Sequence, residues 1–293
     1  MTGHEIKIGT MVGGYTAPKL IRQINQYGFE SYALNFWQTT DGGDLAEFSK
    51  EVKEAIGDSG AIISCVGVFG NPLQDDNTLD SLKKAIKTAK LFGTDLVNGF
   101  SGALAGQTVE ESMPRFTEVF TELCKLAESE GVRIAFENCP MGGDWDRVTT
   151  NLAFCPRSWE LMFNALPFDN IGLQWEPCHQ MVQLIDPIPQ LRKWAKKIFN
   201  LHGKDATINW DIIREQGIGS GSECSWHRTP GFGDSNWSDI ITILRQNDFV
   251  GSIDIEGWHD PIYSGDLEYT GQVHGLNYLK NCRGGAFIPN PEK

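Results

Sequence analysis

The sequence has no apolar run long enough to span a membrane and no excess of basic residues. None of its apolar stretches approaches the roughly 18 residues that a spanning helix needs. Its start, Met1 to Lys7, lacks the basic segment and the apolar stretch of a signal peptide. A net charge of −13 disfavours binding to phosphate backbones and to anionic membranes. We therefore expect a cytoplasmic protein that binds neither nucleic acid nor membranes.

No low-complexity stretch and no serine- or proline-rich spacer divides the 293 residues. With 40% hydrophobic residues the chain can bury a large core, so one domain is a better interpretation than two. The seven cysteines are scattered and odd in number, which argues against a zinc ribbon or a disulfide framework. We expect a single domain over 1–293 with a short tail after about residue 282. Whether it forms a homo-oligomer is left open.

No glycine-rich dinucleotide-binding fingerprint follows the first expected strand, which makes a Rossmann fold the weaker alternative. Instead, a helical pattern, a glycine or asparagine break and a short β-rich run recur along the chain. Strands are expected at 6–10, 30–36, 61–68, 95–100, 132–137, 171–176, 198–202 and 253–256. Helices are expected at 19–26, 45–56, 79–91, 109–129, 158–166, 188–196, 239–245 and 266–279. Eight such units favour a single (β/α)8 TIM barrel.

The last four expected strands each end on a residue able to bind a metal, namely Glu137, Glu176, His202 and Glu256. In a barrel the carboxyl ends of the strands meet at one mouth, so these side chains should converge. Carboxylates with one imidazole suit Mn²⁺, Mg²⁺ or Co²⁺, with Zn²⁺ as a further alternative. We expect one divalent cation, Mn²⁺ before the others, and a neutral sugar as the substrate.

The segments around these residues resemble the xylose-isomerase-like TIM-barrel superfamily, in particular its sugar isomerase/epimerase branch with the ketose 3-epimerases. They are Phe136-Glu-Asn-Cys-Pro140, Glu176-Pro-Cys-His179, His202-Gly-Lys-Asp205 and Ile255-Glu256. The resemblance implies one divalent ion on the four residues, although the family commonly has Asp where Glu176 stands. It also implies that Glu137 and Glu256 move protons on opposite faces of a sugar, through a metal-stabilised enediolate.

By the same resemblance, His179 contacts a substrate hydroxyl, and Arg228, near a glycine turn in the long loop 203–237, contacts a substrate oxygen. Trp258 follows the last ligand where the family has a charged stretch, which predicts a more aromatic pocket wall. Lys204 and Asp205 are interpreted as a pair that orients the ligand histidine. Two or three further aromatic side chains should touch the sugar, out of Phe36, Trp37, Phe69, Phe100, Trp145 and Trp175.

Three other functions compete with an epimerase. A lyase or dehydratase of a keto sugar, an inosose or a keto-glycoside shares the first proton abstraction, and the sequence does not separate the two. An apurinic endonuclease needs further histidines at the third and fourth strand ends, which read Val66-Gly-Val-Phe-Gly70 and Val97-Asn-Gly-Phe-Ser101. A sugar-binding barrel without catalysis would not need two carboxylates placed to move protons.

Overall fold

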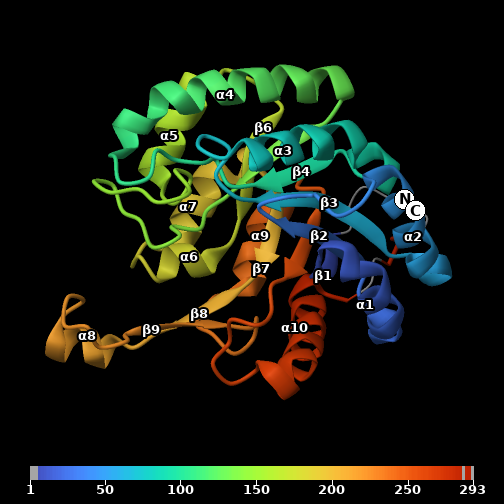
Figure 1. Cartoon of the computed structure of the whole chain (residues 1–293). Helices are drawn as coiled ribbons and strands as arrows, with labels where there is room; N and C mark the ends of the chain where they lie inside the picture. Colours follow the sequence, from blue (N-terminus) through green and yellow to red (C-terminus); the bar gives the residue numbers. More distant parts are fainter. Residues whose placement is uncertain (1–5, 286–287, 292–293) are drawn as a thin grey trace.

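Eight parallel strands close into a barrel, and helices surround it (Figure 1). The computed structural model describes residues 6–285 and 288–291, so Met1 to Glu5 and, in the expected tail, residues 286–287 and 292–293 lie outside it. The strand order is β1-β10-β7-β6-β5-β4-β3-β2. The strands are β1 Lys7–Gly13, β2 Ser31–Trp37, β3 Ile62–Phe69, β4 Leu96–Gly99, β5 Arg133–Glu137, β6 Ile171–Trp175, β7 Ile198–Gly203 and β10 Ser252–Ile255. The predicted (β/α)8 barrel is confirmed.

The helices follow local sequence signals. They are α1 Ala17–Ile24, α2 Leu45–Ile56, α3 Asp76–Thr88, α4 Val109–Glu130, α5 Pro156–Ala165, α6 Pro177–Met181, α7 Pro187–Trp194, α8 Trp210–Gln216, α9 Trp237–Gln246 and α10 Glu268–Arg283. Thr108 and Glu111 form a capping box at the start of α4, and Gly131 ends that helix with φ 63°. The expectation of a helix over 79–91 was three residues late, because Asp75 caps α3 and Ala89–Phe92 forms a tighter turn.

Side chains fill the inside of the barrel below the carboxyl ends of the strands. An apolar layer packs there, made of Met11, Ala33, Cys65, Leu96 and Ala135. Beside it Asp254 accepts hydrogen bonds from Ser31 Oγ at 2.6 Å and Ser64 Oγ at 2.7 Å. This packing closes the interior, so any ligand pocket at the carboxyl ends lies above it.

An arm extends away from the barrel between β7 and α9 (Figure 1). It consists of β8 Asp205–Ile208 and β9 Ser225–Arg228, paired antiparallel, with α8 between them. The sequence predicted only a long loop here, over 203–237. Strands of four residues carry too few alternations to stand out from irregular chain.

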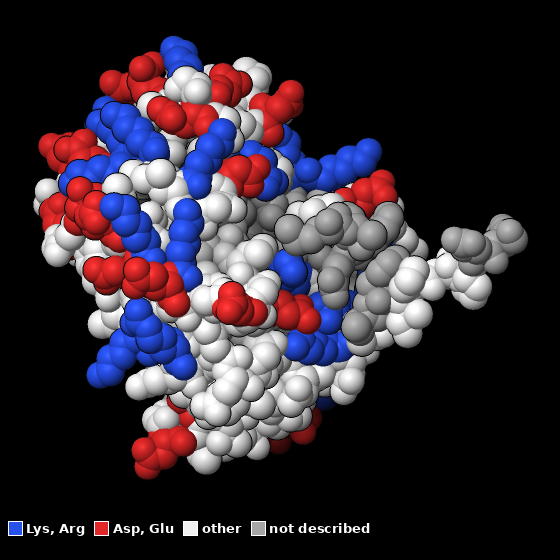
Figure 2. Space-filling model, turned by 90° about the vertical axis from the view of Figure 1, so that its right-hand side faces the viewer, with Lys and Arg blue, Asp and Glu red and all other residues white. Residues whose placement is uncertain are grey.

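Within the described residues no helix is both long and apolar enough to cross a membrane. The face shown in Figure 2 mixes Lys and Arg with Asp and Glu side chains. The cytoplasmic location and the single-domain boundaries with a tail after about 282 stay predictions; α10 continues to Arg283.

Candidate active site

The four strand-end residues come together at one mouth of the barrel. Glu137 ends β5, Glu176 follows β6, His202 lies near the end of β7, and Glu256 follows β10. All four are buried, and one ligand atom from each lies within 4.8 Å of the others. The convergence follows from the parallel order of the strands, which brings their carboxyl ends to the same side.

The polar atoms of this cluster point at one another without forming a complete set of hydrogen bonds. His202 Nδ1 lies 2.8 Å from Glu137 Oε1 and 3.1 Å from Glu256 Oε2. Among the described residues, both oxygens of Glu176, both ring nitrogens of His202 and Glu256 Oε2 lack a well-aligned hydrogen-bond partner. Buried polar atoms are costly when unpaired, and a cation would pair them. This cluster is therefore able to bind a divalent metal.

Two asparagines hold the backbone of the cluster in place. The Glu176 backbone N–H donates to Asn138 Oδ1 at 2.9 Å, and Asn138 Nδ2 donates to the Glu176 carbonyl at 3.0 Å. Asn151 Nδ2 donates to the Glu137 carbonyl at 2.8 Å. Sequence reasoning assigned neither asparagine a role, because asparagines in loops are common and neither lies next in sequence to its partner.

The three carboxylates do not have the same surroundings. Lys204 Nζ donates to Glu256 Oε1 at 2.8 Å, and His259 Nε2 lies 2.9 Å from the same oxygen. Burial favours the neutral acid, but Lys204 and His202 hold the pKa of Glu256 well below its ordinary value. Burial raises the pKa of Glu137, and it raises that of Glu176 from 4.5 to about 7.

The two histidines of the site also differ. Burial lowers the pKa of His202, but the adjacent carboxylates of Glu137 and Glu256 outweigh it and raise the pKa to about 10. Burial and the charge of Lys204 lower the pKa of His179 to about 3, so its imidazole is neutral. His179 Nε2 lies 3.0 Å from Glu176 Oε1.

A pocket of about 380 Å³ opens above the cluster. Polar lining comes from Asn35, Glu137, His179, Lys204, His227, Glu256 and His259. Apolar lining comes from Met11, Phe36, Trp37, Phe69, Phe100, Cys139, Met141 and Trp258, together with Gly13. Four of the six aromatic candidates thus line it, whereas Trp145 and Trp175 do not; how many of them touch a sugar stays a prediction. His179 and Trp258, both expected to touch substrate, face this pocket.

Arg228, the third residue expected to bind substrate, is absent from the described pocket lining. Its Nε donates to Asp260 Oδ2 at 3.0 Å, and His227 lines the pocket in its place. Neighbouring residues of a strand point to opposite sides, so β9 presents only one of the two to the pocket. The sequence contained His227 in the same segment, but nothing local indicated which side each residue would face.

Lys204 and Asp205 do not act together on His202 as a pair. Lys204 reaches Glu256, whereas Asp205 accepts hydrogen bonds from the Ser235 backbone N–H at 3.0 Å and from Trp237 Nε1 at 3.1 Å. The reason is again the alternation of adjacent side chains along an extended chain. Asp205 therefore anchors the base of the arm to the start of α9.

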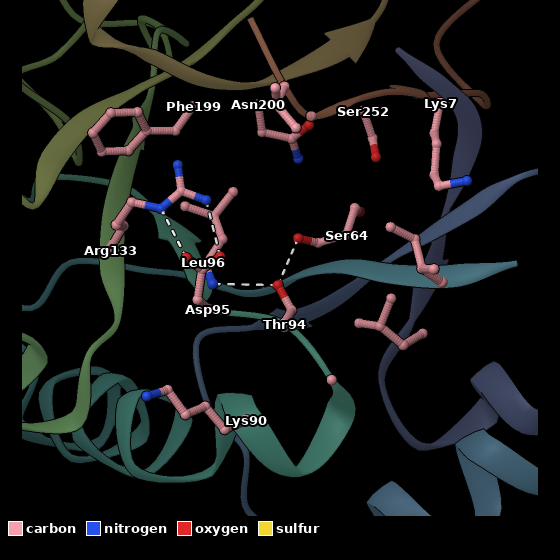
Figure 3. Close-up of a pocket in the computed structure, with 15 residues that line it drawn as sticks. Lys7, Ser64, Lys90, Thr94, Asp95, Leu96, Arg133, Phe199, Asn200 and Ser252 are labelled. Atoms are coloured by element: carbon pink, nitrogen blue, oxygen red, sulfur yellow. Dashed lines mark hydrogen bonds and ion pairs between the residues drawn. The ribbon is translucent and has the colours of Figure 1, made fainter. Parts of the chain in front are cut away.

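A second cavity, of about 710 Å³, lies at the opposite end of the barrel, where the strands begin (Figure 3). On its wall Arg133 Nη2 pairs with Asp95 Oδ1 at 2.9 Å. The metal-capable clusters found among the described residues do not include any residue of its lining. The buried cluster that is able to bind a metal therefore lies at the carboxyl end.

Known proteins share this architecture. Over 166 residues the chain is 23% identical to an inosose dehydratase of Clostridium tetani, a match that covers 55% of the chain and 52% of that protein, about half its length. The 3-keto-D-glucoside 4-epimerase of E. coli superposes with a TM-score of 0.69 at 15% identity, covering 95% of this chain and 100% of that one.

A xylose isomerase-like TIM barrel protein from Mycobacterium smegmatis, in complex with magnesium, superposes with a TM-score of 0.68 at 16% identity, covering 97% of this chain and 99% of that one. At these identities the structures show the shared fold. The sequence profile described as xylose isomerase-like TIM barrel matches residues 21–282. The chain belongs to the xylose isomerase-like TIM barrel family.

Proposed function

We propose that this protein is a divalent-metal-dependent sugar epimerase, which removes a proton next to the carbonyl of a keto sugar and returns one to the same carbon. The observation that carries the proposal is the pair Glu137 and Glu256. Both are buried in one pocket, and both approach His202 Nδ1 from strands that are separated in the barrel by β6 and β7. Inversion at a carbon needs one group that accepts a proton and a second that donates one.

The proposed cofactor is one Mn²⁺ ion, with Mg²⁺, Co²⁺ or Zn²⁺ as alternatives. Three carboxylates and one imidazole suit such ions, and the magnesium in the related M. smegmatis structure supports an ion of this class. The residues that would hold it are Glu137, Glu176, His202 and Glu256. When bound, the ion supplies positive charge that stabilises the enediolate left by proton removal.

Two further residues support Glu256 as the base. Lys204 and His259 both contact its Oε1, so the carboxylate is held ionised and in a fixed direction. Glu137 would return the proton from its own strand. In a pocket from which the sugar excludes water, these charges act more strongly than in solvent.

We propose that the neutral imidazole of His179 exchanges a hydrogen bond with a sugar hydroxyl and that Trp258 stacks on the apolar face of the ring; both residues line the pocket. We add His227 to the substrate contacts because it lines the same pocket. A contact between Arg228 and substrate stays a prediction from resemblance, and it would require the arginine to leave Asp260. The proposed substrate is a small keto sugar without phosphate.

The second candidate function is a dehydratase or lyase. The same base and the same ion would produce the same enediolate, which would then expel a β-substituent. The observation that favours it is the sequence match to an inosose dehydratase. The two functions differ only in the fate of the enediolate.

Deuterium exchange tests both candidates. The Mn²⁺-loaded protein is incubated in D2O with a panel of keto sugars, and the products are weighed by mass spectrometry. One deuterium gained without fragmentation supports an epimerase, whereas loss of water or of an aglycone supports a lyase. Glu137→Gln and Glu256→Gln should each abolish exchange, while Glu118→Gln on the surface of α4 should not. If the wild-type protein binds a sugar but no sugar gains deuterium, both candidate functions are contradicted. A sugar-binding barrel without catalysis then remains.

A further inference from the structure

The pocket above the cluster is lined by polar groups and by large apolar side chains. Glu137, Lys204 and Glu256 are among the polar groups, and the aromatic rings and methionines of the lining form what we call the aromatic wall. A free sugar carries a hydroxyl on nearly every carbon, and each buried hydroxyl needs a hydrogen-bond partner. The aromatic wall provides few such partners, so it suits another part of the ligand.

Two tryptophans of this wall are unusually exposed for such large apolar side chains. Trp37, the last residue of β2, is 63% exposed, and Trp258, after β10, is 52% exposed. Both line the pocket, and Trp258 has its backbone at φ 50°, held by hydrogen bonds from its N–H to the Glu268 carboxylate at 2.8 and 2.9 Å. A non-glycine residue with positive φ is strained, and such strain is found at ligand-binding positions.

We call the space over Gly13, between the strand ends next to these two tryptophans, the slot. β1 lies between β2 and β10 in the barrel and ends at Gly13, which also lines the pocket. A Cβ atom built on Gly13 would meet nothing within 4 Å, so the space over Gly13 is open. The wall continues inward through Phe100, whose ring lies edge-on to Trp37 at 6.4 Å, and Phe69, at 5.3 Å from Phe100.

The aromatic wall reaches the metal cluster. The Phe69 ring lies 6.3 Å from that of His202, so a ligand could place its reacting carbons at the carboxylates and a flat substituent in the slot. The pocket volume of about 380 Å³ lies within the range of about 300–1,000 Å³ that is usual for ligand pockets.

We infer that the substrate is a glycoside of a keto sugar whose aglycone is flat and apolar, such as an aryl group, bound between Trp37 and Trp258 above Gly13. This inference rests on the proposed function for the sugar part and names the class of its substituent. Stacking between two indoles favours an aromatic ring over a methyl group without any new polar contact.

The test uses glycosides that cannot turn over because they have no ketone. Phenyl β-D-glucoside and methyl β-D-glucoside are titrated into the Mn²⁺-loaded protein by calorimetry. The phenyl compound should bind about tenfold more tightly. Equal affinities, or no heat of binding for the phenyl compound, would overturn the inference.

Gly13→Leu should bring the affinity for the phenyl glucoside down to that for the methyl glucoside. The backbone at Gly13, with φ −93° and ψ 122°, accepts any residue, so the variant should fold. Gly219→Leu is the control, since a Cβ there also meets nothing within 4 Å but lies on the arm. Trp37→Ala should act like Gly13→Leu, and Trp210→Ala, another exposed tryptophan, should not.

Exchange in D2O separates this inference from the proposed function. If neither the methyl nor the phenyl 3-ketoglucoside gains deuterium while the phenyl preference in binding persists, the proposed function fails and the slot stands. If both exchange with equal kcat/KM and bind equally, the proposed function stands and the slot fails. An unchanged phenyl preference in Gly13→Leu would also refute the slot.

Discussion

Replacing Glu176 by glutamine should stabilise the metal-free protein and remove its response to metal. The side chain is fully buried, and within the described residues neither oxygen has a well-aligned hydrogen-bond partner. Burial raises its pKa, so the folded protein holds the proton more tightly than the unfolded chain. Stability is therefore lost as the pH rises from the ordinary pKa of 4.5 through the folded value of about 7.

The size of the effect follows from that difference in pKa. Each tenfold change in proton affinity corresponds to about 1.4 kcal/mol, so ionised Glu176 costs the metal-free protein about 3 kcal/mol at pH 8. For a chain of this size 1 kcal/mol moves Tm by about 2 °C, which gives roughly 6 °C. Mn²⁺ at about 100 times its Kd should return about 2.7 kcal/mol to the wild type and little to Glu176→Gln.

Thermal unfolding at pH 8 compares the Tm of Glu176→Gln with that of the wild type, first with a chelator and then with Mn²⁺. Without metal the variant should melt above the wild type, and with Mn²⁺ the order should disappear or reverse. Asp254→Asn is the control for the metal response, because it removes a carboxylate that is buried in the barrel but lies outside the cluster. A metal-free variant that melts below the wild type, or a full metal response in the variant, would refute the reasoning.

Three further predictions concern neighbouring contacts. Lys204→Met should lower kcat for deuterium exchange roughly 100-fold. Calorimetry should find Mn²⁺ bound at least as tightly, because a positive charge beside the metal site is gone. An unchanged kcat would contradict this prediction. His227→Ala should raise KM with little change in Tm, and Arg228→Ala should lower Tm with little change in KM. The reason is that only the histidine lines the pocket, whereas the arginine pairs with Asp260. If instead Arg228→Ala raised KM and His227→Ala lowered Tm, the arginine would be the substrate contact. Although burial acts against it, Arg283 holds the pKa of Glu30 below 4.5. This pair therefore stabilises the fold above that pH, and its contribution is lost as the pH falls through the folded pKa. In Arg283→Met the loss of Tm on acidification should be smaller, and an unchanged pH profile of Tm would contradict this prediction.

Much of the fold was predictable because its signals are local. The helix predicted at 45–56 matches α2, whose apolar residues recur at helical spacing after the capping residue Asp44. Strand positions were predictable because short apolar runs alternate with helices. The arm was not, since α8 and its two strands are short and make no core of their own.

The convergence of the four metal-capable residues was predictable for a different reason. Once a parallel barrel is inferred, every strand end lies at the same mouth, so matching positions on successive strands must meet. No comparable rule links Lys204 with Glu256, which lie 52 residues apart, or Asn138 with Glu176. Such pairs depend on the register between strands and on the rotamers of long side chains.

The sequence by itself thus determined the eight-unit barrel and the end of it at which Glu137, Glu176, His202 and Glu256 gather, because periodicity and chain order contain that information. Tertiary structure alone decided which side chains surround them. His227 rather than Arg228 lines the pocket, Lys204 donates a hydrogen bond to Glu256, and the space over Gly13 at the end of β1 is open. These outcomes depend on which side of its strand each side chain faces and on the space between strands. Neither of these is determined until the chain has packed.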